Sequence, residues 1–412
     1  MPNQIPRPQA LAFIWLTVLI DTIGFGIVLP VLPELIMDLT DVGLSRASVY
    51  GGWLAMTFAV AQFLFGPIMG NLSDRFGRRP VLLVSLVAFG LDYILMGLAP
   101  SMGWLFVGRW LAGMSGAAHA PANAFVADIS APEKRAQNFG LLGAAFGLGF
   151  ILGPAVGGLL GRWGPRAPFF AAAGSALLNA LYGWFVLPES LPRKSRRPFS
   201  WRRASLLGTW KHLCSFPMVA GLISVLFLWQ LAHQVLPTTW AFYTMLKFHW
   251  SEAAVGYSLA YAGVTLMAVQ GGLTRAIVPR LGERWATLGG LAFGVLGFMG
   301  YAWANPGWTM YVWITIAAPS GLVFPSIRAL LSQQIPANAQ GELQGGISSL
   351  YSLTTIVGPV MMTQLFGYFT ASDRAVYFPG AAFAFASLLT LCSIVLFVRT
   401  ERRTVERRDA RQ

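Results

Sequence analysis

Three ionisable side chains lie within long apolar stretches of the chain: Asp21, Asp92 and Arg109. Charged residues inside membrane spans cost about 2.5–3.5 kcal/mol on insertion scales, so such positions usually have a function. Apolar neighbours on both sides of Asp21 favour its neutral form, which makes it the first candidate to bind and release a proton. The alternative is that Asp21 forms a permanent pair with Arg109 or a hydrogen bond to Thr22.

Asp92 and Arg109 are assigned to the same proton-coupling chemistry. Asp92 is a candidate for direct contact with a proton or a substrate, and its alternative role is a helix-packing hydrogen bond. Arg109 keeps its charge under all ordinary conditions. We therefore expect Arg109 to orient an acid or to stabilise its charged form, with simple anchoring as the alternative.

A second group of charges interrupts two apolar segments in the sequence GNLSDRFGRRP, residues 70–80. Three arginines and one aspartate occupy this short turn. A turn that only marked membrane topology would need the arginines and not the acid, so Asp74 suggests that the turn also forms specific ion pairs.

The composition indicates that membrane-spanning helices position these residues. Of the 412 residues, 55% are hydrophobic and 11% are charged, whereas soluble proteins carry about 25% charged residues. Apolar runs of about 20 residues predict an all-α membrane protein rather than a β-barrel. Twelve transmembrane helices are expected, at 9–37, 48–71, 80–99, 102–125, 137–161, 167–187, 216–245, 252–277, 285–304, 307–332, 341–367 and 375–398.

The spans fall into two six-helix bundles. We expect an N-terminal bundle at 1–187, a basic linker at 188–215, a C-terminal bundle at 216–398 and a tail at 399–412. Lys and Arg concentrate in the loops that share a side with both termini, so both termini are predicted to be cytoplasmic. This distribution explains the net charge of +13 better than nucleic-acid binding does. Two distant cysteines and four histidines indicate no metal site and no enzyme chemistry.

The two halves contain matching motifs. Arg75-Phe76-Gly77 recurs as Arg280-Leu281-Gly282, and Gly153-Pro154 recurs as Gly358-Pro359, with both pairs 205 positions apart. A shared offset indicates duplication. Parallel repeats of six spans occur in one known transporter fold, which binds its substrate near the bilayer midplane.

With these motifs, the chain resembles the major facilitator superfamily over nearly its whole length. The 70–80 turn is similar to the superfamily's loop 2–3 signature, GRWLAG (108–113) to its fourth-span arginine motif, and GLGFILGPAVGG (147–158) to the fifth-span motif of drug antiporters. Within the superfamily it resembles tetracycline-resistance efflux proteins, through IDTIGFGIVLPVLP (20–33) and FVADIS (125–130). Leu266 and Gly294 stand where those proteins carry a histidine and an acid in spans eight and nine.

The resemblance implies a bacterial inner-membrane protein, acting as a monomer, that exports tetracycline-like or other amphipathic drugs in exchange for protons. The proton gradient would supply the energy, and no bound cofactor is implied. Transport of another small metabolite is the alternative, and a non-transporting receptor is a more distant one.

In this fold the charged turn is expected to act as a cytoplasmic gate. Asp128 would lie near the turn and join Asp74 and Arg78 in a charge network that is made in one state and broken in another. The gate residues are predicted to be Gly70, Asp74, Arg75, Arg78 and Asp128.

Two further sets complete the predictions. Small residues in the fifth span would let it pack closely against a neighbour, with a kink at the proline: Gly149, Gly153, Pro154 and Gly157. Polar and aromatic residues of facing spans would contact the substrate, although each could instead face lipid or fill the core: Gln62, His119, Asn123, Gln230, His233, Gln234, Trp240, Tyr257, Tyr261 and Gln270.

Overall fold

The protein is described by a computed structural model covering residues 7–116, 119–130, 135–192, 194, 196, 217–335, 340–372 and 374–409. Within these ranges the regular structure is helical, as expected for an all-α membrane protein. Nine of the helices there are long and apolar enough to cross a membrane. Most of the predicted linker at 188–215 lies outside the described residues.

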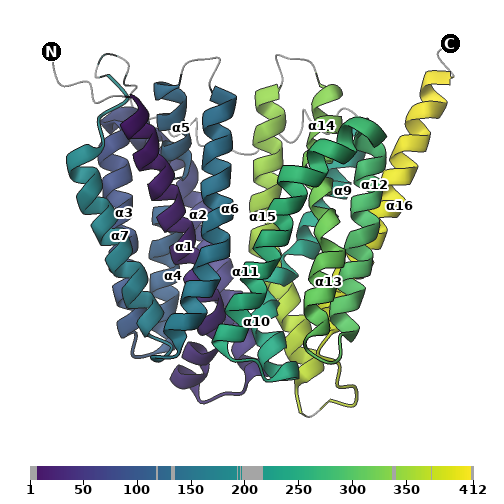
Figure 1. Ribbon diagram of the computed structural model, residues 1–412, viewed down its shortest axis with the longest axis horizontal. Helices are drawn as coiled ribbons and strands as arrows, with labels where there is room; N and C mark the ends of the chain where they lie inside the picture. The colour runs from purple at the N-terminus through teal and green to yellow at the C-terminus, as the bar shows by residue number, and fades with distance from the viewer. Residues whose placement is uncertain are drawn as a thin grey trace. The chain divides into compact units, whose positions relative to one another are not determined.

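The helices of the first half match the six predicted spans (Figure 1). The fourth predicted span corresponds to two helices, α4 and α5, rather than one. The elements are α1 (Arg7–Thr40), α2 (Leu44–Phe76), α3 (Arg78–Leu98), α4 (Met102–Gly116), α5 (His119–Ile129), α6 (Arg135–Gly161) and α7 (Ala167–Val186).

The second half follows the same plan with more interruptions. It contains a π-helical turn, η4, and a 3₁₀ turn, η5. The elements are α9 (Pro217–His233), α10 (Val235–Phe248), α11 (Glu252–Ala268), η4 (Val269–Leu273), α12 (Thr274–Trp303), α13 (Thr309–Ala317), η5 (Ala318–Leu322), α14 (Val323–Gln333), α15 (Gln340–Thr370) and α16 (Ala381–Asp409).

The expected turn between the eighth and ninth spans lies within α12, which is kinked at Gly282, where the backbone angles are non-helical. The ends of the last span differ from the sequence prediction. The last helix begins at 381 rather than 375, because the preceding residues form turns, and it continues to Asp409.

By their contacts, the residues form two compact units. Unit 1 is Met1–Ala204 with Trp250–Gly263, and unit 2 is Ser205–His249 with Val264–Gln412. The first part of α11 therefore belongs with the N-terminal helices, because it packs on α6. Gly256 faces the carbonyl group of Pro154, and Gly158 faces the backbone of Ala253.

The duplication is visible in the backbone. Gly77 has φ 109° and ψ 159°, and Gly282 has φ 76° and ψ 163°. Side-chain-bearing residues rarely adopt these angles, so both halves need glycine at the same turn. The two prolines of the repeat also lie at matching places, Pro154 inside α6 and Pro359 inside α15.

Close packing of α6 against α1 is the main contact of unit 1. A Cβ atom on Gly149 would lie 2.9 Å from the carbonyl oxygen of Leu19, and one on Gly153 would lie 2.7 Å from that of Ile23. Gly157 continues the row against Ile27. The predicted fifth-span glycines therefore meet α1 directly.

This contact fixes how α1 is rotated. Residues that face α6, such as Leu19 and Ile23, lie about half a helical turn from Thr17 and Asp21, at about 100° per residue. Another face of α1 contributes to a buried apolar cluster that also contains residues of α3. There Phe13 and Ile14 share a buried apolar cluster with Leu82 and Leu86.

We predict that replacing Gly153 with valine disrupts unit 1. The new side chain would overlap the α1 backbone, and overpacking of this kind costs about 1–3 kcal/mol or more. The matched control is Gly147→Val in the same helix, because nothing lies within 4 Å of a Cβ atom there. Thermal unfolding in detergent should show a lower midpoint for the Gly153 variant alone, and equal midpoints would contradict this packing.

Candidate functional site

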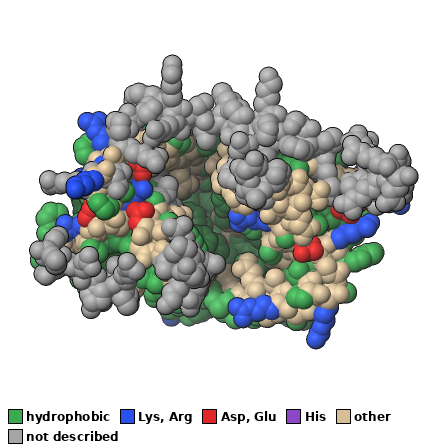
Figure 2. Space-filling model, turned by 90° about the horizontal axis from the view of Figure 1, so that it is seen from above, with side chains coloured by type: hydrophobic (Ala, Val, Ile, Leu, Met, Phe, Trp, Pro, Cys, Tyr) green, Lys and Arg blue, Asp and Glu red, His purple; other side chains and the backbone are tan. Residues whose placement is uncertain are grey.

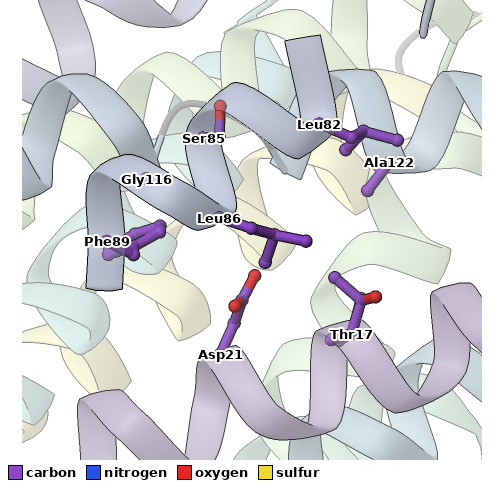
Figure 3. A pocket seen from close by; sticks show the side chains of 9 residues that line it. Thr17, Asp21, Leu82, Ser85, Leu86, Phe89, Gly116 and Ala122 are labelled. Atoms are coloured by element: carbon purple, nitrogen blue, oxygen red, sulfur yellow. The ribbon is translucent and has the colours of Figure 1, made fainter. Parts of the chain in front are cut away.

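Asp21 lies in a small pocket inside unit 1. The pocket is formed by α1, α3, α4 and α5, and Figure 3 shows the Asp21 side chain pointing from α1 toward α3, near Leu86. Its lining residues are Thr17, Val18, Asp21, Leu82, Ser85, Leu86, Phe89, Gly116 and Ala122. Most of the wall is apolar, so a charge on Asp21 would be poorly solvated there.

Asp21 forms no hydrogen bond and no ion pair with other residues in the described part of the chain. The permanent pair with Arg109 left open by the sequence is therefore absent from this structure. Thr22, the other alternative partner, instead donates its hydroxyl hydrogen to the carbonyl oxygen of Val18 at 2.7 Å. The Asp21 carboxyl group thus remains available to exchange a proton.

Arg109 is paired with Asp92. The Nη2 atom of Arg109 lies 3.8 Å from Oδ2 of Asp92, and the two residues are 9% and 2% exposed. Gly108 allows this approach, because a Cβ atom there would lie 2.8 Å from Oδ1 of Asp92. Arg109 also donates to the sulfur of Met96 at 2.8 Å and lies over the ring of Phe58.

Tyr93 of α3 lies between Asp92 and the helix that carries Asp21. It follows Asp92 in sequence, and its hydroxyl oxygen would lie 2.7 Å from a Cβ atom on Gly24 of α1. Its ring stacks on Phe89, which lines the Asp21 pocket. Of the three residues predicted for proton coupling, Arg109 and Asp92 are in contact, and Asp21 has no partner among the described residues.

The charged turn forms a network around Arg78. Its guanidinium group lies 2.6 Å from Oδ1 of Asp74 and 3.3 Å from Oδ2 of Asp128, and it donates to the Ser73 hydroxyl. Figure 2 views this end of the protein and shows Lys and Arg side chains beside Asp and Glu side chains. Asp74, Arg78 and Asp128 thus meet as the sequence predicted.

Glu189 and Ser190 join this network although sequence reasoning did not select them. The backbone N–H of Arg78 donates to Oε1 of Glu189 at 2.9 Å, and Ser190 donates to Oδ2 of Asp128 at 3.1 Å. Glu189 is an isolated acid at the start of a basic segment. The same reasoning that selected Asp74 would have found it.

Two predicted gate residues lie outside the network. Arg75 is exposed and its guanidinium group lies over the ring of Phe76. Nothing lies within 4 Å of a Cβ atom at Gly70, so no close helix contact requires glycine there. Gly77 has the turn-forming role instead, since it combines a positive φ with close contact to Glu189.

The predicted substrate residues of unit 1 are partly exposed. Gln62 donates to the carbonyl oxygen of Gly116 at 3.4 Å, and Asn123 is exposed on α5. Tyr257 and Tyr261 are 45% and 37% exposed. The side chain of His119 lies outside the described residues.

The predicted substrate residues of unit 2 are mostly buried. Gln230 and Gln234 are each 8% exposed, and Gln234 lies against Gly358 of α15. His233 contacts the rings of Trp229 and Phe298, while Trp240 is 3% exposed among Tyr301 and Phe383. Only Gln270 is exposed, in the π-helical turn η4. Turns of this kind occur frequently at functional sites.

Duplicated membrane-spanning halves and buried ionisable residues define a polytopic membrane transporter. The chain belongs to the Major Facilitator Superfamily, whose family model matches residues 14–359. It is thus a transport protein for a small molecule and not an enzyme.

Several relatives are similar over most of the chain. The Tetracycline resistance protein, class C, of Escherichia coli is 41% identical over 358 residues, which cover 87% of this chain and 90% of that protein. The class G protein of Vibrio anguillarum is 37% identical, covering 84% and 88%. The crystal structure of the human organic anion transporter MFSD10 (TETRAN) is 26% identical, covers 96% of this chain and 100% of that chain, and has a TM-score of 0.70.

We predict that Asp92 and Arg109 are energetically coupled. Removing one partner of a buried ion pair costs about 3–5 kcal/mol, because the other charge remains buried. Asp92→Asn and Arg109→Gln should each lower the thermal unfolding midpoint in detergent strongly. The loss in free energy of unfolding of the double variant should be smaller than the two single losses added together, by about 0.5–3 kcal/mol. Strictly additive losses would show that the pair does not interact.

Proposed function

We propose that this protein exports tetracycline-like or other amphipathic drugs across a bacterial inner membrane in exchange for protons. The supporting observation is Asp21, an acid without a partner among the described residues, in a pocket halfway along α1. Identities of 41% and 37% to tetracycline-resistance proteins support the choice of substrate class.

Asp21 carries the proton in this proposal. When protonated it is neutral and compatible with its apolar pocket, and when it loses the proton the pocket contains a poorly solvated charge. This difference in free energy favours different conformations of the protein in the two protonation states. Arg109, paired with Asp92, keeps a positive charge nearby. No bound cofactor is required, because the proton gradient supplies the energy.

The Arg78 network acts as the gate. Its ion pair with Asp128 joins the turn between α2 and α3 to α5, and the hydrogen bond from the Arg78 backbone N–H to Glu189 joins the turn to the segment after α7. These contacts resist separation of the elements. The transporter must break these contacts when it changes from one conformation to the other. Both termini lie in the cytoplasm, on the same side as this network, and the transporter works as a monomer.

The substrate contacts come from exposed polar and aromatic side chains of the predicted set. Gln62, Asn123, Tyr257 and Gln270 are accessible in this conformation, whereas Trp240 would need its surroundings to open. Aromatic rings suit an amphipathic, aromatic drug.

We predict that Asp21→Asn uncouples transport from the proton gradient. In inverted membrane vesicles with an imposed pH gradient, tetracycline accumulation should fall at least about tenfold, because asparagine cannot release a proton. Exchange of tetracycline between equal pools across the membrane, which needs no net proton movement, should continue.

The matched control is Asp41→Asn. Asp41 follows α1 with φ 51°, a conformation that asparagine also tolerates. Its variant should accumulate tetracycline as the intact protein does. If Asp21→Asn also accumulated tetracycline normally, another residue would carry the proton.

We predict that Arg78→Ala slows transport while Arg75→Ala does not. Hydrogen bonds to charged groups are worth about 1.5–3 kcal/mol each, so losing the network shifts the conformational balance about tenfold or more. Tetracycline accumulation in the same vesicles should fall for the Arg78 variant and stay within about twofold for the exposed Arg75 variant. Equal losses in both would show that only positive charge matters at this turn.

A second candidate is export of an organic anion. It is favoured by the 26% identity to an organic anion transporter and by Leu266 and Gly294, which replace ionisable residues expected from the tetracycline efflux resemblance. The same vesicles loaded with a fluorescent organic anion distinguish the two substrates.

A further inference from the structure

The Asp21 pocket contains two buried hydroxyl groups that lack partners in the described part of the chain. They belong to Thr17, which is 3% exposed, and Ser85, which is 2% exposed. Both residues line the pocket together with Asp21.

Hydroxyl groups in helices usually avoid this situation. Thr22 and Ser115 donate to carbonyl oxygens four residues earlier in their own helices. Buried polar atoms nearly always have a hydrogen-bond partner, and water often supplies it. Thr17 and Ser85 therefore indicate a ligand at this place.

The helix geometry places these groups around Asp21. Thr17 precedes Asp21 by four residues and lies on the same face of α1. Ser85 comes from α3, on the face that also contributes Leu82 and Phe89 (Figure 3). Both α1 and α3 begin at the end of unit 1 that contains Arg78, and Ser85 lies about two helical turns from Arg78.

The chemistry of the pocket fits water. A carboxyl group and two hydroxyl groups can each donate or accept, as a water molecule requires. One carboxyl group and two hydroxyls between apolar walls are too few oxygen ligands for a dehydrated metal ion.

We propose that the pocket is a hydration site in which Thr17 and Ser85 bind water against the Asp21 carboxyl group, and that this water moves protons between Asp21 and the Arg78 end of unit 1. The relay part rests on the proposed role of Asp21 as proton carrier. In each transfer the O–H bond of the Asp21 carboxyl group breaks and one forms on water. That water passes another of its protons to a further water molecule on the Arg78 side, which carries it to the solvent as hydronium, so the first water is restored and Asp21 is left as a carboxylate.

The test measures proton exchange at Asp21 without any substrate. The C=O stretching band of protonated Asp21, identified by its loss in Asp21→Asn, is followed by infrared spectroscopy after transfer of the full-length protein in detergent into D₂O. The double variant Thr17→Val/Ser85→Ala should exchange at least about tenfold more slowly, because its pocket no longer binds the water.

Water itself is detected by hydroxyl-radical labelling after mixing into H₂¹⁸O. Labelling of Leu82, Leu86 and Phe89 from bound water should fall at least about fivefold in the same double variant. The matched control is Thr22→Val/Ser115→Ala, which removes two buried hydroxyls already bonded within their own helices. Thr17→Ser/Ser85→Thr, which keeps both hydroxyls, should restore exchange and labelling.

Normal labelling in the Thr17/Ser85 double variant would overturn the hydration site. If the same variant lost the labelling but exchanged the Asp21 proton at the normal rate, the water would be present in the intact protein but would not carry the proton, and the relay would be overturned. Equal effects in the Thr22/Ser115 control would also overturn the proposal, because losing any two buried hydroxyl groups would then slow exchange and reduce labelling. Failure of the proposed function would be recognised by a different experiment. In that case the Asp21→Asn variant would still accumulate tetracycline when a pH gradient is applied.

Discussion

The contact between the glycines of α6 and the backbone of α1 determines the chemistry of unit 1. Without side chains at Gly149, Gly153 and Gly157, the two helices approach until backbone meets backbone. Such an approach allows only one rotation of α1. The opposite face, with Thr17 and Asp21, must then point at α3. The position of the acid therefore follows from residues on a helix that does not itself line the pocket.

The charged groups of unit 1 occupy three different electrostatic environments. Asp92 and Arg109 are buried and lie 3.8 Å apart as an ion pair, which offsets part of the hydration that burial removes. Arg78 lies at a helix end, where its guanidinium group pairs with Asp74 and Asp128. Asp21 lies among mostly apolar side chains and has no hydrogen-bond or ion-pair partner in the described part of the chain. The proposal that Asp21 carries the proton rests on this contrast.

Much of this arrangement could be predicted from sequence, because apolar length, loop charge and repeated motifs depend on local composition. The twelve spans, the meeting of Asp74, Arg78 and Asp128, and the fifth-span packing needed only such signals. The pairing of Arg109 with Asp92 rather than Asp21 depended on the rotation of α1, α3 and α4, which periodicity in uniformly apolar helices does not reveal. The burial of Trp240 and the exclusion of Arg75 likewise depended on tertiary packing.

Comparison of the repeats shows where the chemistry is concentrated. At the constant offset of 205 residues, Asp21, Asp92 and Arg109 correspond to Leu226, Gly297 and Ile314, and Thr17 and Ser85 correspond to Leu222 and Gly290. Leu222, Leu226 and Ile314 are buried in unit 2. The Arg78–Asp128 ion pair corresponds to Glu283 and Gln333, which retain only a hydrogen bond of 3.4 Å. The shared turn glycines show that the backbone plan was kept. The ionisable and hydroxyl groups of the Asp21 region therefore have apolar or glycine counterparts at the matching positions of the second half.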